Sequence, residues 1–468
     1  MVAPFDFSRA LGEHAVAIGG GLAGLATAGA LARHFERVTL LDLDAFPPST
    51  AHRSGTPQDR HTHGLLRGGF VALEELFPGF GRELEHAGAI PLSLGIDTRY
   101  ERPGFDSFPQ RDFGLRSYTM SRPLIERVVR ERVEQCPNVT LRGRCRVREI
   151  VATPDGSSVS SVRFEHGERP ETLAADLVVD ASGRGDLTIG LLETLHKPMP
   201  RETRVGVDLG YSTALFEIPD DAPSDWKGIL CFPKTPQSSR FGILMPLEGR
   251  RWIVSLAGRF DDKPPGDPRG FLAFARSLRT PTIARALESA KRLSDVFRFG
   301  TRTCVRRDFS NVEAFPQGLI VLGDALCRFN PMYGQGMSVA AQQARLLQGL
   351  LEDAARGSRL LPGLAPAFFA AAHAVFDAPW SMTTALDLAY PQTQGLRPPD
   401  LEERIEFGRA LLHLSVSDPS VHRLMLAVQH LMEPQSVYRD PALLERVRAV
   451  IVEMRAEARS GGEPLLVR

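Results

Sequence analysis

Residues 323–337 hold the side chains and glycines of this chain best suited to binding chemistry. Asp324 directly follows an apolar run that predicts a buried strand, so its carboxylate would lie where that strand ends and a loop leads into a helix. Ligands of open α/β sheets bind at this edge. Gly334 and Gly336 flank Gln335 and would let the backbone approach a planar or anionic group closely. The amides of the helix that follows could therefore hold a flavin ring, which becomes anionic on reduction.

A second motif near the start of the chain predicts a dinucleotide site. Gly19, Gly21 and Gly24 form a G-x-G-x-x-G pattern between a short apolar strand and an Ala/Leu-rich helix. In that context the first glycine permits a tight turn, the second admits the pyrophosphate, and the third allows the helix to pack on the strand. Asp42 ends the next predicted strand and would accept hydrogen bonds from a ribose diol, with Asp44 as the alternative.

The elements around these motifs predict a chain that leaves one domain and later returns to it. About three hundred residues separate the two motifs, yet both need strands of a parallel sheet, and a further strand ending at Asp180 suits that sheet. Several strand-like runs between 205 and 256 predict an antiparallel sheet, which would form the floor of a substrate cavity; 205–209 and 214–218 are expected as separate strands. Residues 267–290 also predict a helix, and from Leu364 onward the chain predicts only helices, near 364–376, 401–417, 419–432 and 440–458.

Charge and cysteine content exclude several classes of protein. Lysine plus arginine equals aspartate plus glutamate at 56 each, so no net basic charge favours nucleic acid as a partner. The five cysteines contain no C-x-x-C pair, which argues against a disulfide framework and against zinc. His61 and His63 form an H-x-H pair without a further ligand set, so we expect loop histidines and no metal site.

The N-terminal region predicts a cytoplasmic protein without an integral membrane span. Residues 1–13 lack the basic leader of a signal peptide. Residues 15–32 carry no charge and could be mistaken for a membrane helix by length. Their strand-like start and many glycines and alanines suit a nucleotide-binding turn better than a lipid-facing helix.

The order of the motifs carries a resemblance to a known family. Four motifs carry the resemblance: the G-x-G-x-x-G loop, Arg122 at a predicted helix start, the Asp180 strand with its glycine turn, and the 323–337 stretch. Over residues 12–370, the chain resembles the single-component flavoprotein monooxygenases of the aromatic-hydroxylase fold. Within that group, the chain is similar to bacterial polyether epoxidases of the lasalocid and monensin type. The Trp-x-Trp-x-Ile-Pro signature of flavin halogenases does not occur. The epoxidase resemblance is carried by 53–66, 73–79 and the stretch from Trp380 to Pro391.

The resemblance implies an α/β fold with a Rossmann-like FAD-binding domain, an inserted antiparallel-sheet substrate domain and a C-terminal helical region. We expect the FAD-binding domain to comprise 12–90, 119–190 and 300–363, the substrate-binding domain 91–118 and 191–299, and the helical region 364–458. No catalytic residue is identified, although Pro331 and Tyr333 are candidates to line the substrate site. Together, the motifs and the resemblance predict FAD contacts at Gly19, Gly21, Leu22, Ala23, Gly24, Asp42, Arg53, Arg122, Val147, Gly323, Asp324, Pro331, Gly334, Gln335, Gly336 and Met337.

The implied activity is that of an FAD-dependent monooxygenase. It would use NADPH or NADH and dioxygen (O2) to insert one oxygen atom into a lipophilic polyene or aromatic polyketide, most simply by alkene epoxidation in secondary-metabolite biosynthesis. Epoxidation needs no protein base, whereas hydroxylation of a phenol needs one that the sequence does not identify. Three alternatives stay open: an aromatic polyketide or phenol hydroxylase, a flavin-dependent reductase of isoprenoid double bonds, and a non-catalytic flavin-binding protein.

Overall fold

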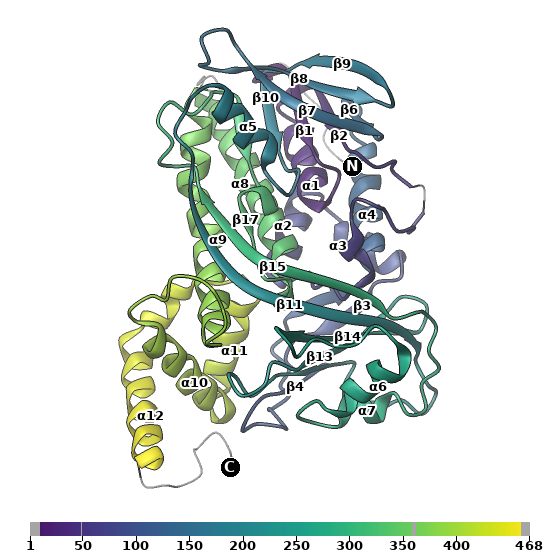
Figure 1. Ribbon diagram of the computed structural model, residues 1–468, viewed down its shortest axis with the longest axis vertical. Coiled ribbons are helices and arrows are strands. Elements are labelled where there is room, and N and C mark those ends of the chain that lie inside the picture. The colour runs from purple at the N-terminus through teal and green to yellow at the C-terminus, as the bar shows by residue number, and fades with distance from the viewer. Residues whose placement is uncertain (1–9, 48, 358–361, 460–468) are drawn as a thin grey trace.

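The computed structural model describes residues 10–47, 49–357 and 362–459, and Figure 1 shows its arrangement. A parallel sheet and a small antiparallel sheet occupy one end of the molecule, and a large twisted sheet crosses its middle. The helices between residues 401 and 459 form a separate group toward the other end (Figure 1). Within the described ranges, no helix has a stretch both long and apolar enough for a membrane span.

The five-stranded parallel sheet is assembled from segments distant in the chain. Its order is β16-β10-β1-β2-β6, and each neighbouring pair is parallel. The central strands are buried on both faces, which explains their unbroken apolar sequences. The bounds of the strands are β1 Gly12–Ile18, β2 Phe35–Leu41, β6 Val139–Arg142, β10 Leu177–Asp180 and β16 Leu319–Val321.

Helices cover this sheet and bring both motifs to one edge. Helix α1 packs against α4 and α8, and α8 packs in turn against α2 and α9. Both α1 and α8 begin directly after a glycine-containing loop, so both N-termini face the carboxyl edge of the sheet. The helices are α1 Leu22–Leu31, α2 Arg67–Leu76, α3 Phe80–His86, α4 Arg122–Glu134, α5 Asp186–Thr194 and α8 Gly336–Gly357.

Two small sheets flank this region. Strands β7, β8 and β9 form an antiparallel meander, and β3 pairs with β5. Short 3-10 helices occur in the loops at the sheet edge. The bounds are β3 Ile90–Ser93, β5 Arg116–Thr119, β7 Cys145–Ala152, β8 Val159–His166, β9 Arg169–Ala174, η2 Pro57–Arg60, η3 Gly323–Ala325 and η4 Pro331–Tyr333.

The large sheet has seven strands in the order β17-β15-β11-β14-β13-β12-β4. Alternate residues face opposite sides, so Leu244 and Leu256 pack on the cluster around helices α6 and α7, while their neighbours Ile243 and Ala257 face the other side. The bounds are β4 Thr98–Glu101, β11 Arg201–Glu217, β12 Gly228–Cys231, β13 Phe241–Leu247, β14 Arg251–Arg259, β15 Phe297–Asp308, β17 Cys327–Arg328, α6 Pro268–Arg276 and α7 Thr282–Ala286.

One feature of this sheet differs from the sequence-based expectation. The separate strands predicted at 205–209 and 214–218 are one strand, β11, whose register against β15 shifts between Gly206 and Leu209. That irregularity, with Asp208 at φ 36°, interrupts the apolar alternation without ending the strand. In addition, β15 pairs with β11 across the expected domain boundary at residue 300, so the division into domains stays a proposal.

The C-terminal part is helical, as the sequence predicts. The expected end of its first helix near 376 is wrong, because α9 continues through Pro379 to Leu388. Proline removes one backbone hydrogen bond there, but Phe376 and Trp380 on either side are buried and keep the helix against the core. The bounds are α9 Leu364–Leu388, α10 Leu401–Ser417, α11 Pro419–Gln429, η5 Gln435–Arg439 and α12 Pro441–Arg459.

Candidate active site

One cavity of about 1100 Å³ connects the carboxyl edge of the parallel sheet with the inner face of the large sheet. Pockets for a single small ligand usually measure about 300–1,000 Å³, so this cavity has room for a cofactor and part of a second molecule. Most of the residues predicted as cofactor contacts line it: Gly19, Gly21, Leu22, Ala23, Asp42, Arg53, Arg122, Val147, Asp324, Pro331, Gly334, Gly336 and Met337, together with Tyr333.

Three predicted residues, Gly24, Gly323 and Gln335, do not line the cavity. A Cβ on Gly24 would lie 1.7 Å from the carbonyl oxygen of Gly19, so Gly24 permits close packing of α1 on the preceding loop. Gly323 has φ 67°, and its amide donates a hydrogen bond to Gln343 Oε1 over 2.7 Å. The Gln335 side chain is buried, and its Oε1 has no hydrogen-bond partner within the described residues.

The first glycine loop leaves open space where an anion would approach. Gly19 has φ 107°, and a Cβ there would lie 2.5 Å from the carbonyl oxygen of Ala181, so this position requires glycine. A Cβ on Gly21 would meet only Arg122 Nη2, at 3.8 Å. Gly21 is also the N-cap of α1 and supplies no side-chain cap. The amides of the first turn therefore remain available to a ligand in the cavity.

Asp42 follows the end of β2, and its carboxylate holds the strand end against the first glycine loop. Its carboxylate accepts hydrogen bonds from the Gly20 amide at 2.5 Å and from the Asp44 amide at 2.8 Å. Arg53 Nη1 donates to the same carboxylate over 3.1 Å. Burial raises the pKa of Asp42, while Arg53 and the two amides act in the opposite direction.

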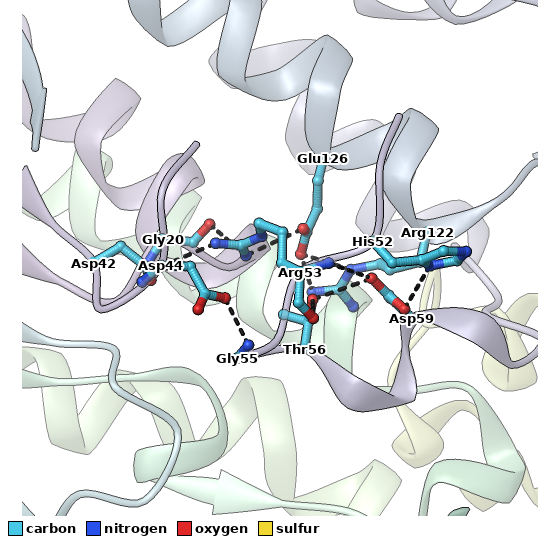
Figure 2. Close-up of polar contacts among 10 residues, drawn as sticks. All are labelled: Gly20, Asp42, Asp44, His52, Arg53, Gly55, Thr56, Asp59, Arg122 and Glu126. Carbon is cyan, nitrogen blue, oxygen red and sulfur yellow. Dashed lines mark hydrogen bonds and ion pairs between the residues drawn. The ribbon is translucent and has the colours of Figure 1, made fainter. Parts of the chain in front are cut away.

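Arg53 and Arg122 share one carboxylate that the sequence analysis missed. Figure 2 shows Arg53 between the Gly20–Asp42 corner and Glu126. Glu126 Oε2 accepts from Arg53 Nη2 at 3.2 Å, and its Oε1 lies 2.6 Å from Arg122 Nη2. Burial raises the pKa of Glu126, but the two guanidinium groups outweigh that effect and lower it. The i,i+4 spacing of Arg122 and Glu126 on a predicted helix is the sequence feature that could have indicated this ion pair.

A loop anchored by two aspartates carries Arg53. Asp44 accepts from the Gly55 amide at 2.6 Å. Asp59 accepts from the Arg53 amide at 3.2 Å and lies 2.8 Å from His52 Nδ1. Figure 2 shows these contacts around the Arg53 backbone. The loop therefore orients its arginine toward the dinucleotide end of the cavity.

The second motif lines the same cavity as the first. The Asp324 side chain is open to the cavity yet lies deep in the molecule, and this burial raises its pKa, with Arg328 acting against the shift. A Cβ on Gly336 would lie 3.6 Å from Asp324 Oδ1. Gly334 has φ 67° and lies against Gly64 of the opposite loop. The N-terminus of α8 and the Asp324 carboxylate therefore occupy one wall.

The remaining walls contain residues for which the sequence analysis predicted no role in binding a cofactor or substrate. Arg146, Arg184 and Arg328 line the cavity, as do His61 and His63. His61 Nδ1 lies 2.7 Å from Thr213 Oγ1, and His63 Nδ1 lies 2.8 Å from the His61 carbonyl oxygen. Among the residues that the structure describes, no group of three or more His, Cys, Asp or Glu side chains is arranged to hold a metal ion. The large sheet adds the apolar side chains Leu230, Phe241, Ile243, Met245, Ala257 and Phe299.

The residues present fit FAD. Gly21 leaves a space that a side chain would fill, beside uncapped amides suited to a pyrophosphate. Asp42 and Asp324 are carboxylates open to the same cavity and can accept hydrogen bonds from sugar hydroxyls. Gly334 and Gly336 lie where a planar ring could approach the start of α8. Fold and cavity together define a Rossmann-type, FAD-binding flavoprotein.

Comparisons with known proteins agree with this class. The family model described as FAD binding domain matches residues 14–364, and the chain belongs to that family. Protein Rv3254 of Mycobacterium tuberculosis (strain ATCC 25618 / H37Rv) is 31% identical over 394 residues, covering 81% of each protein.

Solved structures share the fold at low identity. p-Nitrophenol 4-monooxygenase PnpA from Pseudomonas putida DLL-E4 has a TM-score of 0.62 at 16% identity, covering 90% of this chain and 98% of that chain. The flavin-dependent brominase Bmp2 has a TM-score of 0.68 at 13% identity, covering 95% of this chain and 100% of that chain. At these identities the likeness shows a fold common to flavin-dependent monooxygenases and halogenases, and nothing about substrate.

Proposed function

We propose that this protein is an FAD-dependent monooxygenase that inserts one oxygen atom from dioxygen into a lipophilic substrate, with NADPH or NADH as reductant. The observation that carries the proposal is the continuity of one cavity. Its dinucleotide end is built by Gly21, Asp42 and Asp324, and its other end by apolar side chains of the large sheet. A cofactor bound at the first end would therefore be in direct reach of an apolar molecule at the second.

We assign the binding of FAD to residues from both motifs. Gly21 and the amides of Leu22 and Ala23 would receive the pyrophosphate, and Asp42 the ribose. Asp324 would accept hydrogen bonds from the ribityl chain. The other predicted contacts that line the cavity would surround the cofactor: Gly19, Arg53, Arg122, Val147, Pro331, Gly334, Gly336 and Met337. Gly24, Gly323 and Gln335 do not line the cavity and would support the two loops from behind.

Reduced FAD, when bound, supplies the electrons that activate dioxygen. The protein's own contribution is enclosure and orientation. Ile243, Met245 and Phe299 would exclude water from the apolar end and hold a hydrocarbon chain against the cofactor end. Phe241 and Leu230 extend the same surface. An apolar wall of this kind suits an alkene, and no charged group need act on an alkene during oxygen transfer.

We therefore propose alkene epoxidation as the specific reaction, consistent with the sequence resemblance of residues 53–66 to polyether epoxidases. Hydroxylation of a phenol is the second candidate, and one observation favours it. His61 lines the cavity as a neutral imidazole and could accept a hydrogen bond from a phenolic hydroxyl, a contact for which the sequence alone identified no residue.

Oxygen labelling distinguishes these reactions. The holoenzyme is incubated with NADPH or NADH, labelled dioxygen and farnesol, a linear polyene with trisubstituted alkenes, and products are analysed by mass spectrometry. We expect one labelled atom in an epoxide, and none from labelled water. A matched reaction without reductant should give no product. Efficient hydroxylation of a phenol with farnesol untouched would replace epoxidation by aromatic hydroxylation, and oxygen-independent saturation of an alkene would indicate a reductase.

A further inference from the structure

A chain of four hydrogen-bonded polar side chains, His61, Thr213, Ser255 and Thr62, lies at the end of the cavity formed by the large sheet, and His61, Thr62 and Ser255 line that cavity. His61 Nδ1 lies 2.7 Å from Thr213 Oγ1, which lies 2.5 Å from Ser255 Oγ. Ser255 Oγ lies 2.8 Å from Thr62 Oγ1 and also accepts a hydrogen bond from the Thr62 amide at 3.3 Å. The chain therefore links the 61–62 loop to β11 and β14, and both of its ends belong to that loop.

Aromatic and apolar side chains pack around the His61 ring. His61 packs edge-on against Tyr211, with ring centroids 5.1 Å apart, and lies 5.8 Å from the Phe299 ring. Ala257 of β14 lines the same wall. Polar groups buried among such neighbours need hydrogen-bond partners, and Thr213 and Ser255 satisfy one another. His61 Nε2, by contrast, has no hydrogen-bond partner among the residues that the structure describes, while His61 itself lines the cavity.

His61 is uncharged under neutral conditions. Burial lowers its pKa to about 4, and Arg60 contributes to the same shift. A neutral imidazole has one donor and one acceptor nitrogen, and the hydroxyls of the chain can rotate. When Nδ1 donates to Thr213, Nε2 accepts; when Thr213 donates to Nδ1, Nε2 donates. A substrate hydroxyl can do both, so it matches either state of the chain.

We propose that His61 Nε2 is the specificity-determining contact for a single neutral hydroxyl on an otherwise apolar substrate, with Thr213 and Ser255 as positioning residues. This inference rests on the proposed function, because it places the substrate at the apolar end of the cavity. The substrate class is then a long unsaturated alcohol, bound with its hydroxyl at His61 and its hydrocarbon chain along β13 and β14.

Binding to the holoenzyme tests this without turnover. Isothermal titration calorimetry compares farnesol with farnesene, a hydrocarbon of the same chain length, in the absence of reductant. The quantity measured is the ratio of the farnesene Kd to the farnesol Kd, because that ratio cancels the shared apolar contacts. His61→Leu should lower the ratio about 3- to 10-fold, the range expected for loss of one neutral hydrogen bond.

Further variants separate recognition from folding. His61→Gln carries an amide near the position of Nε2 and should restore part of the ratio. Thr213→Val preserves shape but removes the partner of Nδ1, so the ratio should fall by a smaller factor. Thr98→Val removes a different buried hydroxyl from the same cavity and should keep the wild-type ratio.

An unchanged ratio in both His61→Leu and Thr213→Val would overturn the assignment, and so would an equal fall in Thr98→Val. Lack of saturable farnesol binding to the wild type would also contradict it. Failure of the proposed function has a different signature. In that case farnesol binds with the predicted variant pattern, but no labelled oxygen is transferred.

Discussion

The hydroxyl of Tyr333 donates a hydrogen bond to Asp387 Oδ1 over 2.8 Å, which joins the 323–337 motif to helix α9. Arg259, at the end of β14, donates to the same oxygen over 2.5 Å, and Asn330 donates to both carboxylate oxygens at 2.9 and 3.2 Å. The side chains of Arg259 and Asp387 are each only 1% exposed. One buried carboxylate thus fixes the large sheet, the FAD-side motif and the C-terminal helices relative to one another.

Asp387→Asn should therefore destabilise the protein strongly. The substitution keeps the shape but leaves the Arg259 charge buried without an opposite charge, which costs about 3–5 kcal/mol when a buried pair is broken. Urea denaturation followed by circular dichroism measures the free energy of unfolding. Asp220→Asn is the matched control. Asp220 forms an ion pair with Arg250, but the Asp220 side chain is fully exposed, so loss of this pair should not change the free energy of unfolding measurably. Equal stability of the two variants would show that the buried carboxylate is not structural.

Gly21→Val should abolish FAD retention while the protein still folds. The new side chain would extend into the open space beside Arg122, where we place the pyrophosphate. The absorbance ratio of flavin to protein after purification measures occupancy, and circular dichroism verifies the fold. Gly408→Val controls for adding a branched residue at a glycine position. Gly408 is exposed, and a Cβ added there would lie within 4 Å of no other part of the protein beyond its own helix backbone and chain neighbours. Full flavin occupancy in Gly21→Val would contradict the dinucleotide assignment.

Asp324→Asn should weaken cofactor binding without destabilising the apoprotein. Loss of a charged hydrogen bond to the ribityl chain should weaken FAD by about 1.5–3 kcal/mol, measured by fluorescence titration. Because the Asp324 side chain is open to the cavity, urea denaturation of the variant apoprotein should give a free energy of unfolding close to that of the wild type. Unchanged FAD affinity, or a large loss of stability in the variant apoprotein, would assign Asp324 a purely structural role.

Acidification should also destabilise the protein through His34, which lies outside the cavity. Burial lowers the pKa of His34 to about 4. The folded state therefore binds fewer protons than the unfolded state between that value and about 6.5, and stability falls as pH decreases through this window. His34→Gln should reduce the pH slope of the unfolding free energy by up to about 1.4 kcal/mol per pH unit. The same change at exposed His86 controls for the substitution, and parallel slopes for wild type and His34→Gln would refute the prediction.

The local parts of the site could be predicted from the amino-acid sequence. Gly19, Gly21 and Gly24 could be assigned because their roles depend on a strand, a turn and a helix that are contiguous in the chain. Asp324 could be placed at a sheet edge for the same reason, since the apolar run before it predicts a buried strand. Family-level features, including FAD binding, follow from the order of these motifs.

Contacts between residues that are distant in the chain could not be predicted, because they depend on tertiary packing. His61 and Thr213 are 152 positions apart, and their contact depends on how the 61–62 loop packs on the large sheet. Local periodicity indicates that a residue is buried but not which neighbour buries it. For the same reason, α9 continues through Pro379 because tertiary packing of its flanking side chains outweighs the local cost of proline.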